Sequence, residues 1–413
     1  MDYQELLICV ACGSPNLQRV LDLGAQPLAN EYRDSSNVLK SYPLGLNTCT
    51  SCFHSQNTVS VNPEILFKEY SYVSGTSLTL ARYFESLKNE IIANHGPTGK
   101  LLDIGSNDGS FLSTFNDSGW SVIGVDPAAN LVVESVARGV KTIPAFFDQN
   151  LAELLSSEFD VVVAMNVFAH TADPLEILLG IRKLLGENGT AYIQTSQANM
   201  FENSQFDTIY HEHISFFSVR SMKALVKRAG MFLNDVNIVP VHGNSYIWKI
   251  SMKNNLAVGI QTREDFEKAL GFYEKDFYKK YAGEVLHFAV TVSEKINELR
   301  EQGYKIATYG AAAKGNTFLN FARIKLDYVF DDTPHKIGKI APAGGGCRVL
   351  HSSRIAELSS KTLIVIPAWN FREEIKQNIS AVISRSDCLT LLYYPELEIN
   401  EIRPGVIPDS QNL

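Results

Sequence analysis

The sequence predicts an α/β protein with a small cysteine-bearing N-terminal lobe (residues 1–75), a central doubly wound domain (76–255) and a second, smaller α/β unit (256–413). Three observations predict this division. Two Cys-x-x-Cys pairs lie near the N-terminus, strand and helix patterns alternate through the centre, and the alternation resumes after residue 300. A chain of 413 residues is also too long for one compact core.

The composition is ordinary for a globular protein, with 45% hydrophobic and 20% charged residues. The net charge of −8 argues against nucleic acid as a partner, because nucleic-acid binding usually needs a basic surface. No apolar run is long enough to cross a bilayer, and the acidic N-terminus does not resemble a signal peptide. We therefore expect a cytoplasmic protein with reduced thiols and no membrane partner.

Four of the six cysteines form two pairs, Cys9 with Cys12 and Cys49 with Cys52. Each pair can form a turn that offers two thiolates, and a tetrahedral zinc ion binds four such ligands. Four protein ligands leave no open position for water or substrate, so the zinc is expected to be structural. Two disulfides or free thiols are the alternative interpretation.

The central domain is expected to begin with a helix over residues 76–95, where apolar residues recur at helical spacing: Leu80, Tyr83, Phe84, Leu87 and Ile91. The strands predicted after it are Lys100–Gly105, Ser121–Asp126, Asp160–Asn166 and Thr190–Gln194. Helical segments separate these strands, which favours a parallel sheet of the Rossmann type. Ligands of such sheets bind at the carboxyl ends of the strands.

A glycine turn follows the first predicted strand and contains Gly105 and Gly109, which let a cofactor approach the backbone. Asp126 ends the second strand and can accept hydrogen bonds from both ribose hydroxyls. Nicotinamide dinucleotides usually need G-x-G-x-x-G, whereas here Asp108 puts a carboxylate where a pyrophosphate would lie. The turn therefore suits the cationic cofactor S-adenosylmethionine (SAM), and a turn without a ligand is the alternative. The candidate cofactor-binding residues are Asp103, Gly105, Asn107, Asp108, Gly109, Asp126 and Asn166.

The segment Tyr210-His211-Glu212-His213 follows the fourth strand and should lie on the same rim of the sheet. Histidine can act as a base, a carboxylate can orient it, and a phenol can stabilise an oxygen that gains charge. A helical turn would bring Tyr210 to His213, whereas an extended strand would bring it to Glu212. A His-x-His metal site and a polar surface loop are the alternatives. His170 follows the third strand and is expected on this rim, either in the active site or as a structural residue.

The C-terminal unit is expected to follow a helical segment over residues 256–300 and to contain the strands Lys305–Tyr309, Leu326–Asp331 and Thr362–Ile366. The turn Gly310–Thr317 is not a P-loop, because Lys314 precedes Gly315. Its backbone amides and the Lys314 ammonium can still bind a diphosphate. A turn that serves only packing is the alternative.

Together these segments resemble the sugar-nucleotide C-methyltransferases of deoxysugar biosynthesis over nearly the whole chain. The resemblance is carried by the two cysteine pairs and by Leu23–Asn30, Tyr70–Ser77, Asp103–Gly109, Gly124–Pro127, Glu212–Phe217, His242–Gly243 and Tyr309–Asn316. It implies a zinc-binding lobe, a SAM methyltransferase domain and a C-terminal Rossmann-like domain that helps to hold a nucleotide sugar. The implied reaction is methyl transfer from SAM to C-3 of a nucleotide-linked 4-keto-6-deoxy sugar. We expect the enzyme to be monomeric or weakly associating.

By this resemblance, His213 would remove the C-3 proton, Glu212 would support it, and Tyr210 would lie at the 4-keto oxygen. Tyr72 and His170 match the other active-site positions, with Tyr70 as an alternative to Tyr72. The expected substrate-binding residues are His242, Asn244, Lys314 and Asn316.

The chain departs from the family pattern at Phe53 and Asn244, where relatives commonly have glycine, and at Trp248, near which they have arginine. The last two departures bear on the preference for sugar and nucleotide. Sugar O-methylation, nucleotide-sugar oxidation and sugar binding without catalysis are the alternative functions.

Overall fold

The computed structural model describes residues 2–34, 39–68, 70, 73–76, 78–196, 199–241, 243–383 and 387–405. It divides into two compact units, each built from several stretches of the chain. The first unit contains Met1–Leu21, Leu46–Asn199 and Glu212–Lys279, and the second contains Asp22–Gly45, Met200–His211 and Lys280–Leu413. No helix among the described residues is long and apolar enough to span a membrane.

The first unit is built around a sheet with the strand order β12-β13-β10-β9-β6-β7-β8. Its strands are β6 (Thr98–Ile104), β7 (Gly119–Val125), β8 (Thr142–Ile143), β9 (Phe159–Met165), β10 (Leu185–Ser196), β12 (Phe232–Val239) and β13 (Ser245–Ser251). Five neighbouring strands of this sheet pair in parallel: β10, β9, β6, β7 and β8. This arrangement confirms the predicted doubly wound sheet. Strands β8, β12 and β13 were not predicted, and β13 runs antiparallel to both of its neighbours. Strand direction depends on the pairing partner and leaves no local mark in the sequence.

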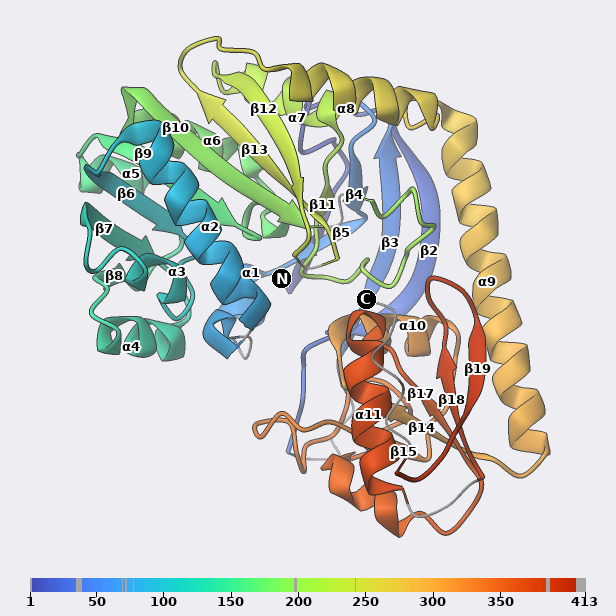
Figure 1. The fold of residues 1–413 in the computed structure, drawn as a ribbon. Coiled ribbons are helices and arrows are strands. Elements are labelled where there is room, and N and C mark those ends of the chain that lie inside the picture. The colour runs from blue at the N-terminus through green and yellow to red at the C-terminus, as the bar shows by residue number, and fades with distance from the viewer. Residues whose placement is uncertain are drawn as a thin grey trace. The chain divides into compact units, whose positions relative to one another are not determined.

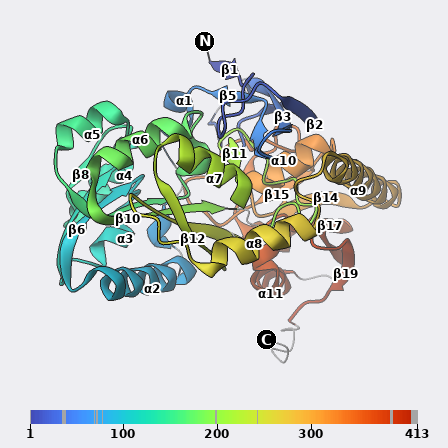
Figure 2. The ribbon, with the colours of Figure 1, turned by 90° about the horizontal axis from the view of Figure 1, so that it is seen from above.

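Alternate residues of each central strand point to opposite faces of the sheet and enter different cores. Leu101 and Val161 pack in one core with α2 (Leu78–His95), whose buried face contains the predicted positions Leu80, Phe84, Leu87 and Ile91. Leu102 and Val162 pack in the other core with α6 (Pro174–Leu184) and α7 (Val219–Arg228). Figure 2 shows α2 on one side of the strands and α5 (Gln149–Leu155) and α6 on the other. The short helices α3 (Ser110–Ser113) and α4 (Ala129–Ala137) follow β6 and β7.

The N-terminal part of the chain forms small antiparallel pairings. Strand β1 (Tyr3–Glu5) pairs with β5 (Val59–Val61), and β4 (Ser55–Asn57) lies between β3 (Ser41–Cys49) and β11 (Ser215–Phe216). Strand β2 (Leu17–Pro27) borders β3, and the short helix α1 (Pro63–Phe67) follows β5. The pairing of β4 with β11 fixes the residues just after His213 against the cysteine-bearing hairpin.

The second unit contains a sheet with the order β16-β15-β14-β17-β18-β19. Its strands are β14 (Lys305–Tyr309), β15 (Tyr328–Phe330), β16 (Val349–Leu350), β17 (Thr362–Val365), β18 (Cys388–Leu392) and β19 (Glu398–Ile402). All pairings are parallel except that of β18 with β19. Helix α10 (Ala313–Phe321) follows β14, and α11 (Arg372–Val382) lies against the sheet (Figure 1). Ile375 and Ile379 of α11 are buried in the core with residues of the sheet. Helices α8 (Val258–Ala269) and α9 (Lys275–Glu301) confirm the predicted helical segment.

Candidate functional site

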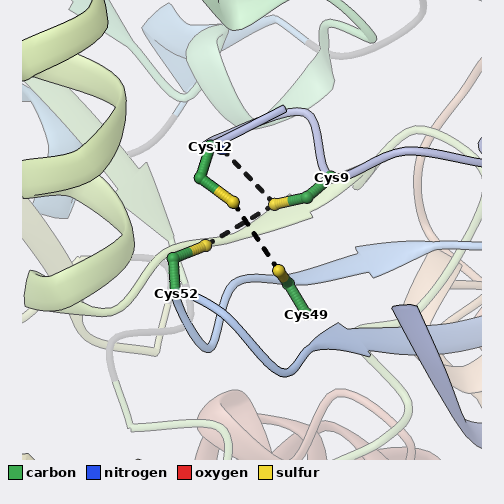
Figure 3. Close-up of side chains that lie close together, drawn as sticks. All are labelled: Cys9, Cys12, Cys49 and Cys52. Atoms are coloured by element: carbon green, nitrogen blue, oxygen red, sulfur yellow. Dashed lines mark hydrogen bonds between the residues drawn. The ribbon is translucent and has the colours of Figure 1, made fainter. Parts of the chain in front are cut away.

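The four N-terminal cysteines converge on one point, as Figure 3 shows. Their sulfur atoms all lie within 4.8 Å of one another, with Cys9 Sγ 3.5 Å from Cys52 Sγ and Cys12 Sγ 3.6 Å from Cys49 Sγ. These separations exceed the ~2.05 Å of a disulfide bond. They match the edges of about 3.8 Å that follow from Zn–S bonds of about 2.3 Å in a tetrahedron. The donor set and its geometry therefore fit a structural zinc ion.

Both cysteine turns close in the same way. The amide of Gly13 donates to Cys9 O, and the amide of Phe53 donates to Cys49 O, both at 2.8 Å. Gly13 has φ +76° and Phe53 has φ +58°, so each turn ends in the left-handed region that glycine tolerates best. The departure at Phe53 thus carries a backbone strain of about 1–2 kcal/mol. The rings of Phe53 and Tyr273 lie 5.8 Å apart, a packing contact that a glycine would not make.

The glycine turn after β6 has the backbone that a close cofactor approach requires. Gly105 (φ +72°) and Gly109 (φ +75°) are both left-handed. A Cβ on Gly105 would lie 2.1 Å from Val167 Cγ2, so no side chain fits there. The Gly105 amide donates to Val125 O at 2.7 Å, which holds the turn against the end of β7.

The end of β7 carries Asp126, as predicted, and its carboxylate shapes the turn. It accepts hydrogen bonds from the amides of Asn107 (2.8 Å) and Ala128 (2.9 Å). Burial raises the pKa of Asp126, and burial together with the nearby Asp126 charge raises the pKa of Asp103 well above its ordinary value.

Three buried side-chain oxygens at or near this turn have no hydrogen-bond donor among the described residues. Within the described ranges, Asp103 Oδ1, Ser106 Oγ and Asn166 Oδ1 are buried without a hydrogen-bond partner. A buried acceptor without a donor is costly, so such atoms call for water or a ligand. The ammonium and ribose hydroxyls of SAM are donors, so the donor set that these residues need fits this cofactor.

Asp108 has a partner that the sequence analysis did not anticipate. Its buried carboxylate accepts from Arg138 Nη2 (2.9 Å), from the Ser110 hydroxyl (2.7 Å) and from the Gly75 amide (3.2 Å). The positive charge beside the Asp108 carboxylate therefore comes from Arg138, whereas the sequence suggested that it would come from the cationic cofactor. The Ser74 amide also donates to Asn107 Oδ1 at 3.0 Å. Asp108 and Asn107 thus hold the segment after α1 against the glycine turn.

Aromatic and acid/base side chains gather next to His213 in the first unit. The rings of His170 and His213 lie 5.1 Å apart, and the Phe67 ring stacks on His170 at 5.8 Å. The Tyr70 hydroxyl donates to Glu212 Oε2 at 3.1 Å. His170 reaches this cluster because it ends the short turn after β9, whereas His213 directly precedes β11. The structure therefore brings His170 and His213 together, and Glu212 directly precedes His213 in the chain.

The other predicted site residues belong to several different segments of the chain. Tyr72 and His242 fall outside the described residues, and Tyr210 is half-buried in the second unit. Asn244 is left-handed, with φ +73°, which explains why glycine is common there. Trp248 is fully buried in the core, and its indole donates to Thr195 Oγ1 at 2.9 Å. Its departure from the family pattern is therefore a packing difference.

The two predicted residues of α10 have different surroundings. The Asn316 amide donates to Ala29 O (2.8 Å) and to the Tyr32 hydroxyl (3.0 Å), so it holds a chain segment. The Lys314 ammonium lies 5.2 Å from the centre of the Trp369 ring. Sequence reasoning missed Trp369, Phe67 and Arg138, because none belongs to a local motif.

His211 has different neighbours from His213, although only one residue separates them in the chain. Its Nε2 lies 3.3 Å from Tyr42 O within the second unit, and burial lowers its pKa from 6.5 to about 4. The unfolded chain therefore binds a proton that the folded chain excludes between these two values. We expect unfolding free energy to fall by roughly 3 kcal/mol as the pH drops from 6.5 to 4 through this residue. Urea unfolding at several pH values should show a shallower dependence for His211→Gln than for the wild type.

Comparisons with known proteins cover nearly the whole chain. Residues 9–67 match the family described as "Putative zinc binding domain", residues 78–233 match "Methyltransferase domain", and residues 240–390 match "C-methyltransferase C-terminal domain". The C-methyltransferase NovU of Streptomyces niveus is 29% identical over 90% of this chain and 91% of its own length. The ubiquinone biosynthesis O-methyltransferase of Ruegeria sp. (strain TM1040) is 28% identical over 38% of this chain and 68% of its own.

Among solved structures, magnesium protoporphyrin IX methyltransferase (ChlM) from Synechocystis PCC 6803 with bound SAM aligns with 13% identity and a TM-score of 0.34. The alignment covers 43% of this chain and 81% of that one.

Proposed function

We propose that this chain is a SAM-dependent sugar C-methyltransferase that methylates C-3 of a nucleotide-linked 4-keto-6-deoxy sugar. The observation that carries the proposal is a cluster of acid/base and aromatic side chains in the same unit as the glycine turn Gly105–Gly109. The cluster consists of His213, His170, Glu212 and Tyr70. Methylation at C-3 needs a base to remove the C-3 hydrogen, which the neighbouring ketone makes acidic.

In the proposed mechanism, the His213 imidazole takes the C-3 proton, and the electron pair moves toward the 4-keto oxygen. Tyr210 donates a hydrogen bond to that oxygen, which gains charge as the enolate forms. Glu212 keeps the His213 ring charged and oriented after proton transfer, and His170 packs against that ring. The bound cofactor supplies the methyl group from its sulfonium, and alignment with the enolate carbon is the main further requirement.

The remaining assignments are part of the same proposal. SAM is held by Asp103, Gly105, Asn107, Gly109, Asp126 and Asn166, with Asp108 acting through Arg138 and the Gly75 amide. His242, Asn244, Lys314 and Asn316 are the proposed substrate-binding residues. We propose that the protein is a monomer. We also propose that it is located in the cytoplasm, because a reducing compartment keeps four thiols available for zinc.

The test is mass spectrometry of candidate nucleotide-linked 4-keto-6-deoxy sugars incubated with the zinc-loaded protein and SAM. The proposal expects a mass gain of one methylene unit, located on C-3 by fragmentation or NMR. Methylation on oxygen, or reduction of a nicotinamide cofactor instead, would contradict it.

The structure also raises a test of which tyrosine serves the active site. Tyr70 acts through Glu212, so Tyr70→Phe should lower kcat about tenfold or more by removing a hydrogen bond to a charged group. It should also shift the acidic limb of the pH–kcat profile, which a merely structural defect would not do. Tyr72→Phe is the matched variant. If only Tyr72→Phe reduces kcat, Tyr72 is the active-site tyrosine and Tyr70 is not needed.

A further inference from the structure

Helix α7 contacts both cysteine turns, one near each of its ends. In its last turn, the Arg228 guanidinium donates to Ala11 O at 2.8 Å, although these residues are 217 positions apart in sequence. At its start, the Ser218 hydroxyl donates to Phe53 O at 3.5 Å, and the Arg220 guanidinium lies 5.8 Å from the centre of the Phe53 ring. All of these residues belong to the first compact unit. The helix therefore contacts the chain around both pairs of predicted zinc ligands.

The cysteines also share a hydrophobic core with this helix. Cys9, Cys49 and Cys52 are buried in the core that contains Met222 and Leu225 of α7. A zinc ion bound by four thiolates carries a net negative charge, because the thiolate charges outweigh that of the divalent cation. Buried charge is costly unless hydrogen bonds and opposite charges compensate it. The residues around the two cysteine turns must therefore provide this compensation.

The first cysteine turn lies outside the strands, between β1 and β2, and side chains hold it in place. The Gln56 carboxamide accepts from the Val10 amide at 2.9 Å and donates to Ile8 O at 3.0 Å. Arg228 Nη1 donates to the two following carbonyls, Val10 O at 3.3 Å and Ala11 O at 2.8 Å. The second turn differs, because it joins β3 to β4, which pair with each other. Gln56 and Arg228 therefore hold the first turn by its main chain.

The peptide unit between Ala11 and Cys12 connects Arg228 to a zinc ligand. The C=O and N–H groups of a trans peptide point in opposite directions. The Ala11 carbonyl accepts from Arg228, and the Cys12 amide of the same peptide unit donates to Cys9 Sγ at 3.5 Å. A guanidinium on the carbonyl polarises the peptide and strengthens its N–H as a donor to the thiolate. Arg228 therefore acts on the Cys9 thiolate through one peptide unit.

We propose that Arg228 stabilises the zinc site without binding the ion, by fixing the first cysteine turn and offsetting the charge of the zinc-bound thiolates. Helix α7 is thereby part of the zinc site, although it contributes no ligand. Replacing a residue that orients metal ligands commonly lowers metal affinity by about 10- to 100-fold. The effect of Arg228 lies near the lower end of this range, because its side chain is exposed and water screens its charge.

The test is competition for zinc between the full chain and a chromophoric chelator, at fixed pH and ionic strength. Arg228→Met should bind zinc about tenfold more weakly than the wild type, because the turn loses its anchor and the thiolates lose a nearby positive charge. Arg182→Met is the matched control. Arg182 is also exposed and donates to a main-chain carbonyl just after α7, Ala229 O at 3.1 Å, but none of its described contacts reaches a cysteine turn. It should keep the wild-type zinc affinity.

Two further measurements separate an effect on the zinc site from a general loss of stability. Arg228→Lys keeps the positive charge and a donor but not the planar guanidinium, so it should recover part of the lost affinity. Cobalt-loaded Arg228→Met should show a shifted thiolate-to-cobalt charge-transfer band, because the hydrogen bond to Cys9 Sγ weakens. Cobalt-loaded Arg182→Met should have the wild-type spectrum. Circular dichroism and thermal unfolding check the fold of each variant.

Several outcomes would overturn the inference. Wild-type zinc affinity with an unchanged cobalt spectrum in folded Arg228→Met would show that Arg228 does not act on the site. An equal loss of affinity in Arg182→Met would assign the effect to the stability of α7 alone. If Arg228→Met does not fold, Arg228→Lys decides, and full wild-type affinity and spectrum would then contradict the inference. A wild type that binds no zinc would also refute it. Because neither sugar nor SAM is present, the outcome is independent of the proposed reaction.

Discussion

Replacing His213 by asparagine is expected to lower kcat for methyl transfer by about 10²- to 10⁴-fold, the usual contribution of a positioned general base. The imidazole is the group that takes the C-3 proton in the proposed reaction, and asparagine has a similar size without a basic nitrogen. SAM binding should be unchanged, because the glycine turn and Asp126 do not depend on this ring.

Solvent deuterium exchange makes the His213 prediction specific to proton removal. The wild type should exchange the C-3 hydrogen of the keto sugar in D₂O when a SAM analogue without a transferable methyl group is bound, and His213→Asn should not. His211→Asn is the matched control, since it removes a neighbouring imidazole that contacts the Tyr42 carbonyl. It should lower stability while retaining exchange. Normal exchange by His213→Asn would rule out this residue as the base.

Cys49→Ser is expected to have the largest effect on stability, with loss of zinc and unfolding of the N-terminal lobe. Structural zinc contributes about 10–16 kcal/mol in small zinc-binding peptides, which is comparable to the total stability of a typical domain. Cys49 ends β3, which pairs with β4, and β4 pairs with β11 directly after His213. Loss of the ion should therefore abolish methyl transfer as well as lower the unfolding temperature.

Zinc content, circular dichroism and activity of Cys49→Ser can be compared with those of Cys347→Ser. The Cys347 thiol donates to Leu326 O at 3.1 Å in the second unit, and a serine hydroxyl can make the same bond. This control should keep one zinc ion per chain and full activity. Retention of zinc and of activity by Cys49→Ser would refute a structural role for the ion.

Much of the cofactor site could be predicted from local sequence. A buried strand that runs into a glycine turn, and a second strand that ends in Asp126, set backbone directions within a few residues. The structure confirms the strands within a few residues at each end. The role of Asp108 could not be predicted, because its charge is compensated by Arg138, 30 residues away, and no local pattern encodes that pairing.

The acid/base cluster was likewise predictable only in part from the sequence. The sequence placed His170, Glu212 and His213 on one rim, because parallel strands end on the same edge of a sheet. It left both the geometry of Tyr210-His211-Glu212-His213 and the choice between Tyr70 and Tyr72 open. The structure connects Tyr70 with Glu212 across 142 residues and turns His211 toward Tyr42 instead.

The sequence by itself predicted the two cysteine pairs, the glycine turn after the first strand and the two α/β units, because each depends on residue types at short, fixed spacing. Only the tertiary structure decided which charges are already paired, such as Asp108 with Arg138, and which buried atoms beside the glycine turn have no hydrogen-bond partner among the described residues. Those properties arise from contacts between distant segments, and such contacts form only when the chain packs.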